Sequence, residues 1–203
     1  MIPPICFVTD PDAPQPVIAQ AIAAAEGGAG WVQLRDKTLP DAEFAELARA
    51  LISALAPYDV PLIVNDRVAV AIEIGAAGLH IGQSDGDPAA IRHRIGSDTI
   101  LGLSIETEAQ IAVVPAGVDY LGVGPIHATG SKPDHAAPIG HAGFAAIAAR
   151  TDLPCLAIGG ITAADASAIR TAGGAGVAVI SAISRAPDMA RATRTLRSAW
   201  SDI

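Results

Sequence analysis

The sequence predicts one domain, a (β/α)8 TIM barrel spanning residues 1–203. Eight short apolar runs rich in β-branched residues alternate with eight longer stretches rich in Ala and Leu. Such alternation is typical of parallel strands joined by helical crossovers. The chain has 203 residues, at the low end of the size range for this fold, and no linker divides it. An open, doubly wound sheet is the alternative, but eight similar units without an obvious switch point favour the barrel.

The apolar runs are short and nearly continuous, as expected for strands that are buried on both faces. We expect these strands at residues 5–8, 31–34, 61–64, 78–81, 100–103, 120–123, 155–158 and 176–180.

The intervening stretches carry Ala and Leu at helical spacing. Thr162 and Asp165 match a capping box at the start of one helix, and glycines at 27–28 and 173–174 suit helix ends. We expect helices at residues 15–27, 40–56, 66–75, 87–95, 106–115, 141–150, 162–173 and 188–199.

Charge and hydropathy exclude several classes of protein. Asp and Glu number 21 against 13 Lys and Arg, for a formal charge of −8, and no basic cluster marks a nucleic-acid surface. No apolar run reaches the length of about 18 residues that a membrane span needs. The first residues lack the features of a secretory signal. Cys6 and Cys155 lie in apolar runs without metal-site spacing, so we expect both to be buried in a reducing cytoplasm.

Polar residues and glycines follow most of the predicted strands. In a (β/α)8 barrel the carboxyl ends of the strands meet at one face, where ligands bind. A purely structural protein has no need for this pattern, so we expect a ligand site at this mouth. The segments concerned are 33–37, 65–67, 80–85, 104, 124–132, 159–161 and 180–181.

Two of these segments predict a phosphate site. Gly159 and Gly160 follow the seventh strand, and Ile180 and Ser181 end the eighth. This is the usual phosphate position in such barrels, and exposed backbone amides there bind an anion. The alternative is that the glycine pair only forms a tight turn before the next helix.

Two carboxylates predict a Mg²⁺ site. Asp66 and Asp85 follow neighbouring strands, and oxygen ligands of this kind suit Mg²⁺. The alternative is that each aspartate only caps the helix that follows it. Arg35, Lys37 and Lys132 surround the pair and favour a diphosphate site, in which cations and metal share the oxygens. Lys37 and Lys132 are also the chain's two lysines.

The histidines receive no catalytic role. His80 and His127 are expected near the mouth, whereas His93, His135 and His141 are expected in loops or at the surface. A loop at 129–132 contributes two hydroxyls and an ammonium, but its glycine spacing does not match a Walker A loop.

These motifs, in this order, resemble the thiamine-phosphate synthase family from the first strand to the eighth. The matching pieces are VTD at 8–10, QLRDK at 33–37, NDR at 65–67, HIGQSD at 80–85, GLS at 102–104, GPIHATGSK at 124–132, IGGI at 158–161 and ISAI at 180–183.

The resemblance implies an enzyme that joins a hydroxymethylpyrimidine diphosphate to a (carboxy)thiazole phosphate, releasing diphosphate. It implies a dissociative reaction, in which diphosphate leaves before the thiazole nitrogen attacks. Arg35, Lys37, Ser104 and Lys132 would be catalytic, and Asp66 and Asp85 would hold Mg²⁺. The pyrimidine diphosphate would contact Gln33, Leu34, Arg35, Asp36, Lys37, Asn65, Ser104 and Lys132. The thiazole phosphate would contact Thr129, Ser131, Gly160, Ile180 and Ser181, and Gly130 would also bind substrate.

Two residues depart from the family pattern. Ser131 stands where Thr is usual and keeps the hydroxyl. Ser84 stands where an acidic residue is common, which removes one charge near the metal and would weaken Mg²⁺ binding modestly. A thiazole tautomerase, a non-catalytic phosphate-ligand barrel and another phosphate-binding barrel enzyme are the alternatives. The implied partners are small phosphorylated molecules, and a homo-oligomer stays open.

Overall fold

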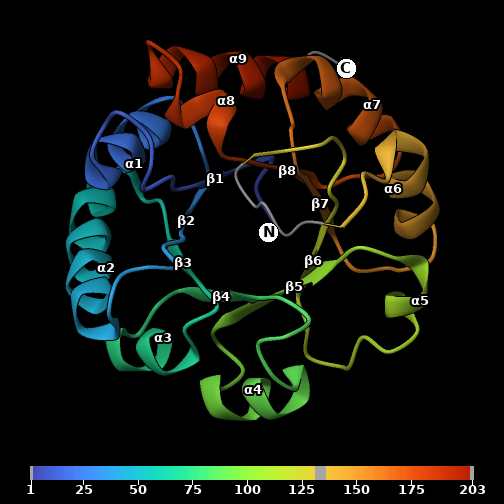
Figure 1. The fold of residues 1–203 in the computed structure, drawn as a ribbon, viewed down its shortest axis with the longest axis horizontal. Helices are drawn as coiled ribbons and strands as arrows, with labels where there is room; N and C mark the ends of the chain where they lie inside the picture. Colours follow the sequence, from blue (N-terminus) through green and yellow to red (C-terminus); the bar gives the residue numbers. More distant parts are fainter. Residues whose placement is uncertain (1, 131–135, 202–203) are drawn as a thin grey trace.

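The computed structural model describes residues 2–130 and 136–201, which form a closed parallel barrel surrounded by helices (Figure 1). Each strand pairs with its neighbours in chain order, and β8 closes the barrel against β1. The predicted fold is therefore confirmed. The strands are β1 Ile5–Val8, β2 Trp31–Leu34, β3 Leu62–Asn65, β4 Gly78–Ile81, β5 Ile100–Ile105, β6 Tyr120–Val123, β7 Cys155–Ile158 and β8 Gly176–Val179.

Three strands, β3, β5 and β8, differ slightly from the predicted ranges, and β8 ends at Val179 rather than at residue 180. β3 begins at Leu62 rather than at Pro61, because proline has no N–H to donate to a neighbouring strand. The Pro61 carbonyl still accepts a hydrogen bond from Val32. β5 continues to Ile105, which pairs with Val123 of β6, so Ser104 belongs to a strand rather than to the loop after it.

Helices follow the strands around the barrel, as the alternation predicts. α5 is a single turn, whereas a longer helix was expected at 106–115. Val113, Val114 and Pro115 follow that turn, and neither β-branched residues nor proline favours its continuation. The short helix α8 was not expected. The helices are α1 Val17–Glu26, α2 Asp41–Leu55, α3 Val68–Ile74, α4 Pro88–Ile95, α5 Glu108–Ile111, α6 Gly140–Ala148, α7 Ala166–Thr171, α8 Ser181–Ser184 and α9 Met189–Ser201, with 3₁₀ turns η1 Ala56–Tyr58 and η2 Ala163–Asp165.

Apolar side chains fill the space between barrel and helices, and a smaller cluster fills the barrel itself. Within the barrel, the Trp31 and Tyr120 rings lie with centroids 5.2 Å apart. Gly102 makes room for the Tyr120 ring, because a Cβ there would lie only 2.2 Å from Cζ of Tyr120. This packed interior closes one end of the barrel and leaves the other open to a ligand.

Both cysteines are buried, as expected. Burial raises the pKa of the Cys6 thiol to about 12 and that of Cys155 to about 11. A thiol protonated at neutral pH is a poor nucleophile, so neither cysteine is a candidate for catalysis.

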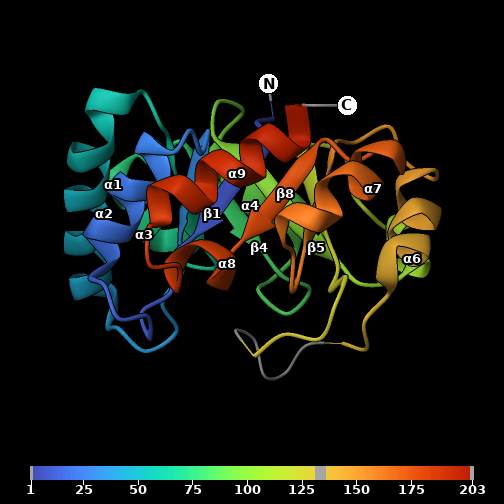
Figure 2. The same ribbon diagram turned by 90° about the horizontal axis from the view of Figure 1, so that it is seen from above.

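The loops that follow the strands lie on one side of the barrel, opposite the two termini (Figure 2). The residues of the predicted site are carried by these loops and strand ends. None of the described helices is long and apolar enough to cross a membrane.

Candidate active site

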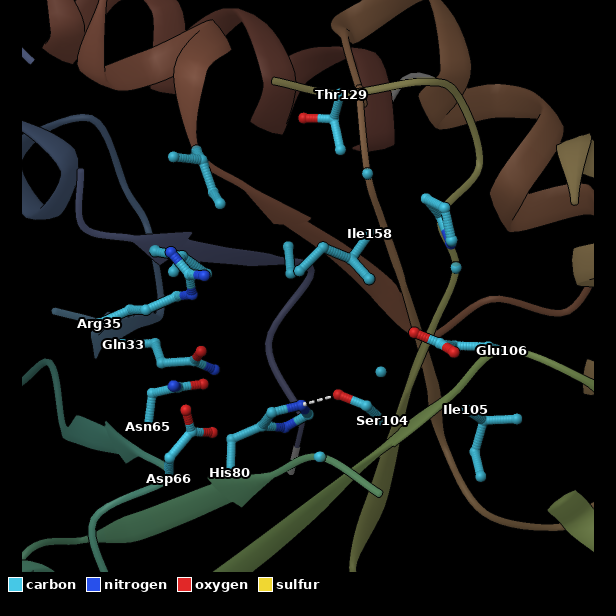
Figure 3. Close-up of a pocket in the computed structure, with 18 of the residues that line it drawn as sticks. Gln33, Arg35, Asn65, Asp66, His80, Ser104, Ile105, Glu106, Thr129 and Ile158 are labelled. Carbon is cyan, nitrogen blue, oxygen red and sulfur yellow. Dashed lines mark hydrogen bonds between the residues drawn. The ribbon is translucent and has the colours of Figure 1, made fainter. Parts of the chain in front are cut away.

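A cavity of about 350 Å³ opens at the carboxyl ends of the strands (Figure 3). Residues from or directly after all eight strands line it. Val8 of β1 and Ala178 of β8 belong both to the cavity lining and to the apolar cluster inside the barrel, so they form its floor. The predicted mouth is thus a real concavity with an apolar base.

The β2 segment places two cations and an amide at the cavity. Gln33, Arg35 and Lys37 all line it. Thr9, at the end of β1, fixes the backbone of residue 35, because its hydroxyl donates to the Arg35 carbonyl (3.3 Å) and accepts from the Arg35 N–H (3.0 Å). The position from which the guanidinium projects is therefore held by the neighbouring strand.

Two residues of the same segment point elsewhere. The Leu34 side chain is fully buried in the core between barrel and helices. Asp36 accepts hydrogen bonds from the backbone of Thr38 and Leu39 at 2.7 and 2.9 Å and stabilises its own loop. Successive side chains of a strand face opposite sides, so 33 and 35 face the cavity whereas 34 does not. Neither residue is among those that line the cavity, and their expected contact with a substrate stays a prediction.

Asp66 and Asp85 meet at the cavity, as predicted. Lys37 forms an ion pair with Asp66. The pKa of Asp85 is raised by burial and by the hydrogen bond and negative charge of the facing Asp66 carboxyl. The hydrogen bond from the Gly82 N–H and the charge of Lys37 act in the opposite direction. The two carboxylates therefore repel each other, and a bound cation would relieve that repulsion.

Helix capping does not explain either aspartate. The N-cap of α3 is Arg67, and the N-cap of α4 is Asp87, whose carboxylate accepts from two backbone amides. Asp66 instead has φ 62°, in the left-handed region that residues other than glycine rarely adopt. Such a conformation costs about 1–3 kcal/mol and is concentrated at functional sites.

The residues present fit a Mg²⁺ ion. Two carboxylates converge on one point of the cavity, Ser84 also lines it, and carboxylates supply the oxygen ligands that Mg²⁺ prefers. Lys37 already supplies one positive charge to Asp66. This part of the cavity can therefore hold a cation between its carboxylates and an anionic ligand.

His80 crosses the inside of the barrel and connects two hydroxyls. Its Nδ1 lies 2.9 Å from the Tyr120 hydroxyl, and its Nε2 lies 2.9 Å from Oγ of Ser104. Burial lowers the pKa of His80 to about 4, with Asp85 opposing the shift, so the ring is neutral at pH 7. A neutral imidazole donates at one nitrogen and accepts at the other, so His80 holds the Ser104 hydroxyl in place at the cavity wall.

The opposite part of the cavity is formed by backbone and hydroxyls rather than by charge. Gly159, Gly160, Ile180, Ser181 and Thr129 line it. Both glycines have positive φ, 96° and 66°. Ser181 begins α8, and the first N–H groups of a helix have no partner within the helix. These groups can bind a phosphate, as predicted for the ends of strands seven and eight.

Comparison with known proteins is consistent with this geometry. The family model described as thiamine monophosphate synthase matches residues 5–183. The chain belongs to the thiamine monophosphate synthase family. It is 48% identical over 176 residues to thiamine-phosphate synthase of Azorhizobium caulinodans, covering 86% of this chain and 83% of the relative. It is 47% identical over 196 residues to thiamine-phosphate synthase of Xanthobacter autotrophicus, and the match covers 95% of this chain and 93% of the relative.

A solved structure of the family has the same barrel. Thiamine phosphate pyrophosphorylase from Pyrococcus furiosus superposes with a TM-score of 0.88 at 31% identity, covering 98% of this chain and 95% of that one. Membership of the thiamine monophosphate synthase family makes the chain an enzyme rather than a structural barrel.

Besides Leu34 and Asp36, three residues of the predicted site are not among the described residues that line the cavity. Ser131 and Lys132 are outside the described residues, and Gly130 does not line the cavity. The described predicted residues that do line it are Gln33, Arg35, Lys37, Asn65, Asp66, Asp85, Ser104, Thr129, Gly160, Ile180 and Ser181.

The structure also gives places to three residues that received no role in the predicted site. Glu106 lines the cavity just after β5. Gln83 donates from its side-chain amide to the Ser104 carbonyl at 2.6 Å. Arg67 contacts the carbonyls of Asp36 and Leu39 and lies over the Phe44 ring, so it stabilises the loop that carries Lys37. Extending β5 by two residues would have indicated Glu106.

Proposed function

We propose that this chain is a thiamine-phosphate synthase that joins a (diphosphomethyl)aminopyrimidine to a thiazole phosphate. The observation that carries the proposal is the pair of unlike anion sites across one cavity. One combines Arg35 and Lys37 with paired carboxylates, and the other combines glycine backbone with Ser181. Two such sites suit a reaction that holds a departing diphosphate and a retained phosphate at the same time.

In the proposed reaction the bond between the pyrimidine methylene carbon and the diphosphate oxygen breaks. The diphosphate departs with the electron pair and leaves a pyrimidine-stabilised cation. The thiazole ring nitrogen then donates its electron pair and forms the new C–N bond, giving thiamine phosphate. With a carboxylated thiazole, carbon dioxide is lost as well.

The chain's own residues would act mainly on the leaving group. Arg35 and Lys37, with Lys132, would hold the diphosphate oxygens, and Asp66 and Asp85 would hold Mg²⁺. Mg²⁺, when bound, supplies positive charge to the developing diphosphate. Ser104, oriented by His80, would accept or donate one hydrogen bond at the pyrimidine side. Preorganised charge of this kind lowers the barrier to a heterolytic step.

The rest of the cavity would protect the cation from water. Val8, Ile105, Ile158, Ala178 and Ile180 line it and offer no nucleophile. A cation of this type reacts with any water within reach, so apolar walls favour capture by the thiazole nitrogen. This arrangement needs no nucleophile–base pair, which agrees with the protonated state of both buried cysteines.

The test is to incubate the enzyme with both substrates and Mg²⁺ and to measure thiamine phosphate and diphosphate. We expect equimolar formation of the two products. Conversion of the thiazole phosphate alone, without the pyrimidine substrate, would indicate the tautomerase instead. Saturable binding of both molecules without any product would indicate a non-catalytic barrel.

A further inference from the structure

We propose that His127, His141 and Asp165 form a binding site for a divalent transition-metal ion such as Zn²⁺. The site goes beyond the proposed synthase reaction. None of its three residues lines the cavity, and it is distinct from the Asp66–Asp85 pair. Two imidazole nitrogens and one carboxylate oxygen are a common set of ligands for Zn²⁺.

The ligand atoms already converge. Nε2 of His127 lies 2.7 Å from Oδ1 of Asp165, and Nε2 of His141 lies 2.9 Å from the same oxygen. One potential ligand atom from each of the three residues lies within 4.8 Å of the others. Zn²⁺ binds its ligand atoms at about 2.0–2.2 Å. Small side-chain movements would therefore let an ion replace the two hydrogen bonds between the histidines and Asp165.

Asp165 is oriented and charged as a metal ligand should be. It is only 7% exposed, and its other oxygen, Oδ2, accepts from the N–H and hydroxyl of Thr162 at 2.8 and 2.9 Å. Burial would raise its pKa, but hydrogen bonds from His127, Thr162 and His141 outweigh burial and lower it to about 2. Outer partners that fix a ligand carboxylate in this way strengthen metal binding.

The two histidines remain accessible. Their side chains are 45% and 40% exposed, and their rings meet edge to face with centroids 5.5 Å apart. Solvent can therefore reach the cluster and supply a water as the fourth ligand. The alternative is that the cluster is only a set of hydrogen bonds, in which both histidines donate to the same Asp165 oxygen. In that case no ion would bind.

The three residues come from separate segments of the chain, so a bound ion would connect these segments. His127 lies four residues after β6, His141 lies in the first turn of α6, and Asp165 ends η2. An ion at this point would cross-link both ends of the β6–α6 segment to the chain after β7. The same region is already close-packed, because a Cβ on Gly160 would lie 2.8 Å from Cβ of His127.

The ligand types also predict selectivity. Imidazole favours Zn²⁺, Co²⁺ and Ni²⁺, whereas Mg²⁺ prefers an all-oxygen site. Zn²⁺ at the histidine cluster would therefore not require the Asp66–Asp85 site, and Mg²⁺ would not occupy the histidine cluster.

The experiment titrates untagged, metal-free enzyme with Zn²⁺ by calorimetry and with Co²⁺ by visible absorption. We expect one tight ion per chain and a Co²⁺ spectrum of low coordination number. His127→Gln and His141→Gln should each weaken binding about 100-fold or more. His93→Gln is the matched control, because His93 is an exposed histidine on α4, and it should bind as the wild type does.

Further variants and a wild-type measurement make the outcome decisive. The double variant Asp66→Asn/Asp85→Asn should keep the Zn²⁺ site, and loss of binding there would overturn the assignment. In the wild type, Zn²⁺ should protect His127 and His141, but not His93, from diethylpyrocarbonate, as mapped by mass spectrometry. Absence of saturable binding, or binding unchanged in both histidine variants, would also overturn it.

Discussion

The two sides of the cavity are built to bind anions in different ways. On the β2–β4 side, charged side chains converge, with Lys37 paired to Asp66 and Asp85 facing it. On the β7–β8 side, glycine backbone and a helix start supply N–H groups without a charged side chain among the described lining residues of those two strands. The first side therefore fits the proposed metal-bound diphosphate, and the second fits the proposed metal-free phosphate.

The two sides should therefore be sensitive to different kinds of substitution. A charged side depends on the functional groups at the tips of side chains, so isosteric neutralisation should disable it without changing its shape. A backbone side depends on the path of the chain, so an added methyl group should disable it without changing any charge.

The largest effect is expected at Asp85. Asp85→Asn keeps the size of the side chain but removes half of the carboxylate pair, and we expect turnover to fall by about 10³-fold or more in steady-state assays with saturating Mg²⁺. Asp87→Asn is the matched control, because Asp87 only caps α4 and should cost little activity. Equal activity of Asp85→Asn and Asp87→Asn would contradict a catalytic metal pair.

The next effect tests the backbone side at Gly160. Gly160→Ala forces a residue with φ 66° to carry a Cβ only 2.8 Å from His127 and 3.1 Å from the Ala128 carbonyl. We expect the KM for the thiazole phosphate to rise about 10- to 100-fold, the loss of one or two hydrogen bonds to a charged group, with a smaller effect on the pyrimidine diphosphate.

Gly75 provides a control that distinguishes backbone strain from a steric clash at the site. Gly75 has φ 62°, nearly the same conformation, but nothing lies within 4 Å of a Cβ there. Gly75→Ala should lower stability by about 1 kcal/mol and leave both KM values unchanged. If Gly75→Ala and Gly160→Ala behaved alike in the kinetic assay, the effect would be one of general stability rather than of a phosphate site.

The fold was largely predictable from sequence, because each element is defined by a local pattern. The alternation of short apolar runs and Ala-rich stretches placed all eight strands within one or two residues. Apart from small shifts of element ends and the 3₁₀ turn η1, the main departures are the single-turn elements α5 and α8, since a four-residue helix carries too little periodicity to detect.

The site was predictable where a residue type alone reveals the chemistry. Asp66, Asp85 and Lys37 follow strand ends and converge as expected. Leu34 and Asp36 were included only because they lie inside a contiguous motif, although the two-residue period of a strand turns Leu34 away from the cavity.

Contacts between distant residues could not be predicted. His80 meets a hydroxyl 40 residues further along the chain, and Asp165 meets His127 38 residues before it. No local pattern encodes such pairs, because they depend on how neighbouring strands and loops pack in three dimensions. His141 was accordingly expected in a loop or at the surface, with no role.

A moderate effect is expected in the pH dependence of stability at His80. The folded protein lowers the pKa of His80 to about 4 from an ordinary value of 6.5, so the unfolded chain binds the extra proton first as the pH falls. Stability is therefore lost between about pH 6.5 and 4, by up to about 3 kcal/mol. Urea unfolding of wild type and His80→Gln across this range should show a flatter curve for the variant. Parallel curves would contradict a buried neutral imidazole.

The smallest effect is expected at Ser84, which lines the cavity beside Asp85. Ser84→Glu adds a carboxylate to the charged side, and we expect the Mg²⁺ concentration for half-maximal activity to fall a few-fold, the effect of about 1 kcal/mol of added attraction. Ser181→Glu is the contrasting variant on the backbone side, where an added negative charge should weaken binding of the thiazole phosphate and leave the Mg²⁺ requirement unchanged.

The most direct test of the two-sided cavity is calorimetric binding of each substrate separately, with and without Mg²⁺. The pyrimidine diphosphate should bind at least about tenfold more tightly with Mg²⁺, and Asp85→Asn should abolish that gain. The thiazole phosphate should bind equally well in both conditions. A Mg²⁺ dependence shared by both substrates, or confined to the thiazole phosphate, would contradict the division of the cavity into a charged side and a backbone side.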